Sequence, residues 1–182
     1  MASEPDADPI AETQRWLERA VIGLNLCPFA KAVHAKRQVR TVLSDAEDPR
    51  DLLEQLGEEL LRLRDTPADQ IDTTLLVHPH VLQDFLDYND FLDDADALVE
   101  SLGLEGVLQV ASFHPDYRFA DAEPGDMENW SNRSPYPTLH LLREDSVARA
   151  VDAYPEPDAI IERNRATLRA LGREGWERLL KP

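Results

Sequence analysis

Apolar residues along this chain follow two spacings, one typical of strands and one typical of helices. The segments Gln38–Ser44, Asp72–His78 and Gly106–His114 are rich in β-branched and apolar residues, which predicts three strands. The run Thr138–Leu142 fits a fourth strand. These four segments are the expected strands of the sheet.

Outside the predicted strands, apolar residues recur every three or four positions, which predicts amphipathic helices. An Asp-Pro pair begins two of them, because aspartate caps a helix and proline tolerates its first turn. The expected helices run from Asp8 to about Leu24, Phe29 to about Ala35, Asp48 to about Leu63, Val81 to Leu102, Ser146 to Ala153, Asp158 to Leu171 and Glu174 to Leu180.

The spacing of strands and helices indicates the fold class. Helices of about 17 and 20 residues separate the first three strands, a length typical of crossovers between parallel strands. The sequence therefore predicts an α/β fold, a mixed and partly parallel sheet of about four strands with helices packed on it as a two- or three-layer sandwich. Its 182 residues fit a single domain, expected over residues 9–182 after a flexible tail of residues 1–8.

Acidic residues outnumber basic ones by 36 to 19, which gives a formal net charge of −17. Such a chain repels polyanions, so nucleic-acid binding is not expected. Every apolar run is shorter than the roughly 18 to 20 residues that span a bilayer, so no membrane segment is expected either. The acidic N-terminus lacks a signal-peptide pattern and the single cysteine excludes an internal disulfide, so a cytoplasmic setting is expected.

Acidic residues are concentrated in the predicted helix Val81–Leu102. Lys and Arg are absent between Arg64 and Arg118, whereas six Asp fall between Asp84 and Asp96. Their spacing places most of them opposite the apolar stripe of the helix, where they face water. The same acidic face supports an alternative function, a non-catalytic binding or adaptor protein that docks a basic partner.

Histidines follow two of the predicted strands, in His78-Pro79-His80 and in His114-Pro115. In open α/β sheets ligands bind at the carboxyl ends of strands, so these imidazoles would meet if the two strands are parallel neighbours. His78, His80 and His114 would then be ligands for a divalent metal such as zinc or iron(II). The alternatives are a metal-free role in an active site and a structural role, in which the histidines cap backbone groups.

The long polar segment before Thr138 is the expected substrate-binding loop. Arg118 and Arg133 offer paired donors to a carboxylate or phosphate, and Asn132 and Tyr136 add further hydrogen-bonding groups. The competing interpretation is that each arginine pairs with a neighbouring carboxylate of this acidic chain.

His140 and Cys27 are two further candidates. His140 alternates with leucines, so it either faces a pocket as a general base or is buried as a structural histidine. If Pro28 begins the short helix, Cys27 stands at its N-terminal cap, where the helix dipole favours a reactive thiolate. The competing interpretation of Cys27 is an ordinary buried cysteine.

Several long motifs resemble one known family. They are Trp16-Leu17, GLNLCPFA at Gly23–Ala30, LLVHPH at Leu75–His80, FHPDYRF at Phe113–Phe119 and NRSPYPTLHLLRE at Asn132–Glu144. In combination they look like the domain-of-unknown-function family DUF1415, over a range from about Trp16 to Leu171. The resemblance implies a bacterial-type cytoplasmic protein that stands alone as one domain, and it carries over no activity, cofactor or catalytic residue.

Together these features predict a small soluble enzyme that acts on a small polar or anionic metabolite by hydrolysis or oxidation. The expected catalytic residues are His114, His140 and Cys27, with a zinc or iron ion as the possible cofactor. No Gly-rich phosphate loop or dinucleotide fingerprint occurs, so no nucleotide cofactor is expected. The sequence leaves the oligomeric state open.

Overall fold

The computed structural model describes residues 7–182, so residues 1–6 of the predicted tail lie outside the described residues. The strands are β1 (Val39–Leu43), β2 (Thr73–Val77), β3 (Leu108–Phe113) and β4 (Thr138–Arg143). The helices are α1 (Pro9–Trp16), the π-helix η1 (Leu17–Ile22), α2 (Ala30–Ala35), α3 (Pro49–Asp65), α4 (Phe85–Ser101), the 3-10 helix η2 (Met127–Asn132), α5 (Glu144–Ala153) and α6 (Ala159–Leu180). Every predicted strand and helix is present, although several begin or end at other residues.

The four strands form one mixed sheet in the order β1-β2-β4-β3. β1 and β2 are parallel and are joined through α3, as the crossover spacing predicts. β4 lies between β2 and β3 and is antiparallel to both, with His140 paired to Leu75 on one side and to Ala111 on the other. The α/β class and the mixed sheet are confirmed. The condition for the metal site, that β2 and β3 are parallel neighbours, is not met, because β4 separates them.

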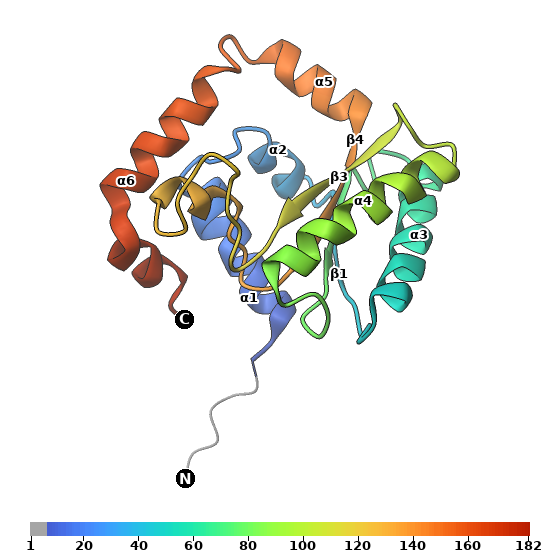
Figure 1. The fold of residues 1–182 in the computed structure, drawn as a ribbon. Coiled ribbons are helices and arrows are strands. Elements are labelled where there is room, and N and C mark those ends of the chain that lie inside the picture. The colour runs from blue at the N-terminus through green and yellow to red at the C-terminus, as the bar shows by residue number, and fades with distance from the viewer. Residues whose placement is uncertain (1–6) are drawn as a thin grey trace.

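Helices α3 and α4 cover one face of the sheet and bury their apolar stripes against it (Figure 1). Both helices begin at an aspartate whose side chain accepts backbone N–H bonds in the first turn, Asp48 for α3 and Asp84 for α4. Tyr88 of α4 is fully buried, and its hydroxyl donates to the Thr138 carbonyl at 2.7 Å and accepts from the Phe113 N–H at 3.1 Å. Tyr88 thereby ties α4 to the ends of β3 and β4.

The outer side of α4 is acidic and exposed, as the spacing of its carboxylates predicts. Asp84, Asp87, Asp90 and Asp94 are all exposed, while Phe91, Ala95 and Val99 are buried among the core residues. An adaptor function through this face stays a prediction.

The opposite face of the sheet carries α1, η1 and α6, which pack around Trp16, Leu75 and Trp176 in a second apolar cluster. After β4, the helices α5 and α6 form an arc on this side of the molecule (Figure 1). α6 bends at Gly172, whose φ of +67° is in the left-handed region, close to where the sequence predicts a break between two helices. In the part of the chain that the structure describes, none of the helices is long and apolar enough to cross a bilayer.

Candidate functional site

A cavity of about 580 Å³ lies on the face of the sheet opposite α3 and α4. Its floor consists of side chains from all four strands, because the register of the sheet places alternate residues on this face. Helix η1 and the segment around α2 form one wall, and α5 forms another. The volume falls within the range of about 300 to 1,000 Å³ that is typical of small-molecule sites.

Most of the cavity lining is apolar. Leu17, Leu75, Phe29 and Leu142 are among its aliphatic and aromatic residues. At the edge of the cavity two polar side chains bind each other: the Ser146 hydroxyl donates a hydrogen bond to the Asp72 carboxylate at 2.7 Å. The other lining residues with polar side-chain atoms are Thr73, Gln109, His140, Arg143, Cys27, Trp16 and Tyr154. Among residues 7–182 the buried Trp16 indole N–H has no hydrogen-bond partner.

His140 has a defined proton position. The Thr73 hydroxyl lies 2.7 Å from the Leu141 carbonyl and 2.6 Å from His140 Nε2. A carbonyl only accepts, so the single hydroxyl proton goes to Leu141 and Nε2 must be the donor to Thr73. The other ring nitrogen, Nδ1, then carries a free lone pair. It has no hydrogen-bond partner among residues 7–182 and is not sealed from solvent, so it is open to the cavity.

The surroundings of His140 keep the ring neutral. Desolvation lowers its pKa to about 4, because an imidazolium would have to form in an apolar environment. At neutral pH the cavity therefore presents one unprotonated imidazole nitrogen as an acceptor. Of the two roles that the sequence allows for His140, facing a pocket fits this position better than a fully buried one.

Helix α5 covers the cavity without becoming part of either core. None of its residues is buried, although Val147 and Ala150 line the cavity wall. Tyr154, directly after α5, packs edge-on against Phe29 with ring centroids 5.9 Å apart. The apolar side of α5 therefore faces the cavity and contacts few core side chains.

Cys27 is not at the N-terminal cap of α2, which corrects the position expected from sequence. Phe29 is the cap residue, and α2 begins only at Ala30. The Cys27 side chain is partly buried and lines the cavity that also contains His140. Cys27 therefore lacks the helix-cap position that would favour a thiolate, but it shares a cavity with His140.

His78 and His114 lie on the other face of the sheet, and both pack against the Tyr88 ring, with ring centroids 5.8 and 4.9 Å from it. His78 Nδ1 donates to the Val81 carbonyl at 3.0 Å, and His114 Nε2 donates to the Leu82 carbonyl at 3.0 Å. His114 Nδ1 accepts the N–H of Asp116 at 3.0 Å. Burial lowers the pKa of both histidines, that of His78 to about 4. Both side chains hold the loop between β2 and α4, which is the structural role that the sequence left open.

The expected metal set of His78, His80 and His114 is not assembled. Both ring nitrogens of His114 bind backbone groups, and His80 is exposed. Within residues 7–182 no group of three or more His, Cys, Asp or Glu side chains is arranged to hold a metal ion. The donor set thus does not fit a zinc or iron site in this conformation, and we derive no chemistry from one.

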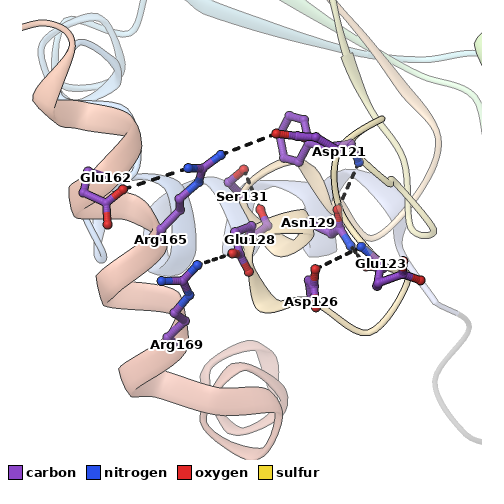
Figure 2. Close-up of polar contacts among 10 residues, drawn as sticks. Asp121, Glu123, Asp126, Glu128, Asn129, Ser131, Glu162, Arg165 and Arg169 are labelled. Carbon is purple, nitrogen blue, oxygen red and sulfur yellow. Dashed lines mark hydrogen bonds and ion pairs between the residues drawn. The ribbon is translucent and has the colours of Figure 1, made fainter.

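The segment between β3 and β4 is ordered by its own polar groups and by α6. Asn129 is buried in η2, where its side chain accepts the Phe119 N–H at 3.0 Å and donates to the Glu123 carbonyl at 2.7 Å. Figure 2 shows two arginines of α6 reaching this segment, with Arg165 near Asp121 and Arg169 paired with Glu128. The segment is therefore fixed by contacts within the chain, and its role as a substrate-binding loop stays a prediction.

The four residues expected to bind substrate are dispersed. Asn132 donates to the Ser112 carbonyl at 3.0 Å, and the Tyr136 hydroxyl donates to Glu12 at 3.0 Å. Burial, together with Glu12, raises the pKa of Tyr136 to about 12. Arg118 is exposed, whereas Arg133 is half-buried and lines a separate, smaller cavity. The side chains of Asn132 and Tyr136 therefore form hydrogen bonds within the protein, which gives both residues a structural role.

A family model described as a protein of unknown function, DUF1415, matches residues 8–178. The chain belongs to the DUF1415 family. This confirms the resemblance drawn from the motifs. Comparisons with curated proteins and with solved structures each returned no match.

Three residues that shape the sites of this DUF1415 chain are missing from the sequence prediction. Thr73 fixes the proton of His140, Tyr88 packs against both His78 and His114, and Gln109 lines the cavity. Thr73 and His140 share a face only through the pairing of β2 with β4, which places Thr73 opposite Leu142. The alternation within each strand is visible in the sequence, but the pairing between strands is not.

Proposed function

We propose that the cavity on the sheet binds a small, largely apolar organic molecule that carries one hydroxyl or N–H donor. His140 Nδ1 accepts the hydrogen bond from that donor. The observation that carries the proposal is this neutral imidazole, held by Thr73 with its free lone pair toward an otherwise mostly apolar cavity of about 580 Å³. The chain would therefore act as a receptor or enzyme for such a molecule.

The lining decides the class of ligand. An apolar wall gains free energy by releasing water from apolar ligand surface, at roughly 25 cal/mol per Å². A charged ligand would lose its hydration there, with Arg143 as the cation on the wall and Asp72 already bonded to Ser146. The polar or anionic metabolite expected from sequence therefore fits this cavity poorly.

The low pKa of His140 favours binding over proton abstraction. A general base works best when its pKa is near the working pH, whereas that of His140 is about 4. A weak base is still a good hydrogen-bond acceptor when it is unprotonated. Catalysis in the same cavity is the second candidate, because Cys27 lines it together with His140 and supplies a nucleophile.

The test uses N-phenyl-1-naphthylamine, a neutral fluorescent probe with a single N–H donor. We expect saturable binding, seen as a rise in probe fluorescence. Ala150→Phe fills the cavity wall and should weaken binding about tenfold or more, whereas the matched change Ala148→Phe on the exposed side of α5 should not. Equal affinity in the two variants would place the probe elsewhere and overturn the proposal.

The role of His140 is tested with His140→Phe, which keeps a ring and leaves Thr73 bonded to the Leu141 carbonyl. Loss of one hydrogen bond is worth about 0.5 to 1.5 kcal/mol, so the affinity for the N–H probe should fall roughly two- to twelvefold. The isosteric ether 1-phenoxynaphthalene, used as a competitor, lacks the donor and should bind both proteins alike. A parallel loss for both molecules would show that His140 only shapes the cavity.

Alkylation of Cys27 measures whether the probe binds close to this residue, because Cys27 is the single cysteine of the chain. Bound N-phenyl-1-naphthylamine should slow the alkylation of Cys27 by iodoacetamide in the folded protein. Unchanged alkylation at saturating probe would separate Cys27 from the ligand and remove the catalytic candidate.

A further inference from the structure

A second cavity, of about 370 Å³, lies between α1, the loop around η2 and the end of α6 beyond Gly172. It shares no lining residue with the cavity on the sheet. Its walls include two buried tryptophans, Trp130 and Trp176, and three arginines, Arg15, Arg133 and Arg173. A binding site in this cavity would therefore be independent of the function proposed for the cavity on the sheet.

Arg133 is held in place by neutral groups. Its Nε donates to the Tyr117 carbonyl at 3.0 Å and one Nη donates to the Pro124 carbonyl at 2.9 Å. The guanidinium lies over the Trp130 ring, 3.9 Å from its centre. These contacts fix its position but do not neutralise its charge, and Arg133 forms no ion pair with any residue in the range 7–182.

Arg173 brings a second positive charge to the same cavity. It lies in α6 just after the bend at Gly172, and its side chain is 77% exposed. Burial lowers the pKa of Arg133, Asp116 opposes that shift, and the nearby Arg173 adds to it. Arg133 and Arg173 both line this cavity, so their guanidinium groups bring like charges to one site.

The carboxylates of this cavity do not bridge the two arginines. Glu177 pairs with Arg173 at 3.2 Å, and Glu12 accepts the hydroxyl of Tyr136. Asp116 attracts Arg133 without forming an ion pair with it. Fixing the loop explains the two carbonyl bonds of Arg133, and the pair with Glu177 uses only the Nε of Arg173. The Nη groups of Arg173 have no hydrogen-bond partner among residues 7–182.

We propose that this cavity is a binding site for a small oxyanion, the carboxylate or phosphate group of a metabolite, held between Arg133 and Arg173. A guanidinium offers two parallel donors to such a group, and Arg133 retains Nη1, which has no protein partner among residues 7–182. The oxyanion offsets the repulsion between the arginines. Trp130 and Trp176 form the apolar sides of the site.

The experiment titrates the full chain with sodium phosphate, and separately with malonate, against sodium chloride at matched ionic strength. The indole N–H resonances of Trp130 and Trp176 report on this cavity, and that of Trp16, which lines the other cavity, is the internal control. We expect saturable shifts of the first two resonances with a Kd of about 1 mM or below for at least one anion. The anion that binds more tightly identifies the headgroup class.

Variants at exposed positions keep the test free of folding defects. Arg173→Gln should weaken binding of the oxyanion by about fivefold or more. Arg178→Gln removes the same charge from an exposed site on the same helix and should leave the affinity unchanged. His140→Phe should also leave it unchanged, which separates this site from the cavity on the sheet. Linear shifts that chloride reproduces, or equal affinities for Arg173→Gln and Arg178→Gln, would overturn the proposal.

Discussion

Three histidines of this chain keep their ring protons at different nitrogens. His78 donates from Nδ1, whereas His114 and His140 donate from Nε2, and the acceptor is a carbonyl in the first two cases and the Thr73 hydroxyl in the third. Burial disfavours the charged ring at each position. Among these three residues, His140 alone has a free ring nitrogen on a cavity wall. Similar burial therefore leaves two histidines structural and one available to a ligand.

The low pKa of His140 predicts acid sensitivity. The unfolded chain protonates this histidine near pH 6.5, whereas the folded chain does so only near pH 4, so the unfolded state binds more protons in between. The stability that neutral His140 contributes is complete above pH 6.5 and is lost as the pH falls toward 4. Between pH 6.5 and 5, the free energy of unfolding should fall by about 2 kcal/mol more in the parent than in His140→Phe.

Urea denaturation at several pH values measures this difference. Ala148→Phe is the control, because Ala148 is exposed and not titratable, so its replacement should leave the pH dependence of the parent unchanged. If His140→Phe and the parent lose stability in parallel over this range, His140 is not the group that resists protonation.

The position of a site residue could be predicted from the sequence where it depends only on the strand or loop that contains the residue. Alternation in Thr138–Leu142 places His140 on one of two faces, and the loop composition points to Arg133. The role of Thr73 depends on a partner 67 residues away, and that of Arg173 depends on a bend in α6. Such long-range contacts follow from packing, which the sequence pattern around each residue does not contain.

At the level of elements, the bend in α6 depends on one glycine. Gly172 has φ +67° and ψ 173°, a backbone conformation that is essentially restricted to glycine. A Cβ atom there would meet nothing within 4 Å, so any cost of a substitution is conformational rather than steric. The bend places Arg173 and Trp176 at the smaller cavity.

Gly172→Ala should destabilise the protein by about 1 to 3 kcal/mol because alanine is strained in this conformation. Gly57→Ala is the matched change inside α3, where the new Cβ would be in ordinary contact with Leu98 at 3.7 Å. That variant should be stabilised by roughly 0.5 to 1 kcal/mol, since alanine favours a helix interior. Chemical denaturation compares the two, and a shift of the same sign in both would contradict the assigned cause.

Helix and strand positions were the most predictable part of the fold, because caps and periodicity are local. Asp8, Asp48 and Asp84 each cap a helix, and the sequence places the first two. The start of α2 was predicted too early, because proline is common in the first turn of a helix and Pro28 fits that position. In the structure Pro28 lies in a turn, and α2 begins at Ala30. That shift of two residues removed the helix-dipole argument for Cys27.

At the scale of the whole molecule, a net charge of −17 opposes the compact state. Asp90 and Asp94 add to this repulsion on the exposed side of α4, where neither forms an ion pair within residues 7–182. Screening by salt should therefore stabilise the fold. The stabilisation by salt arises from the total charge of the chain and not from any single contact.

The melting temperature should rise by several degrees when sodium chloride is increased from low to physiological ionic strength, as measured by differential scanning calorimetry. The double variant Asp90→Asn, Asp94→Asn removes two of the repelling charges and should show a smaller rise. A melting temperature that falls with salt would mean that attractive ion pairs outweigh the repulsion.

The position of β4 between β2 and β3 has a consequence for how the chain is made. A ribosome releases β1, β2 and β3 before β4, so the growing chain holds β3 without a neighbouring strand while β2 keeps one edge open. The sheet closes only when the strand that emerges last inserts between two strands already outside. Until then the edges of β2 and β3 that β4 will join are unpaired, and unpaired strand edges favour association with other chains.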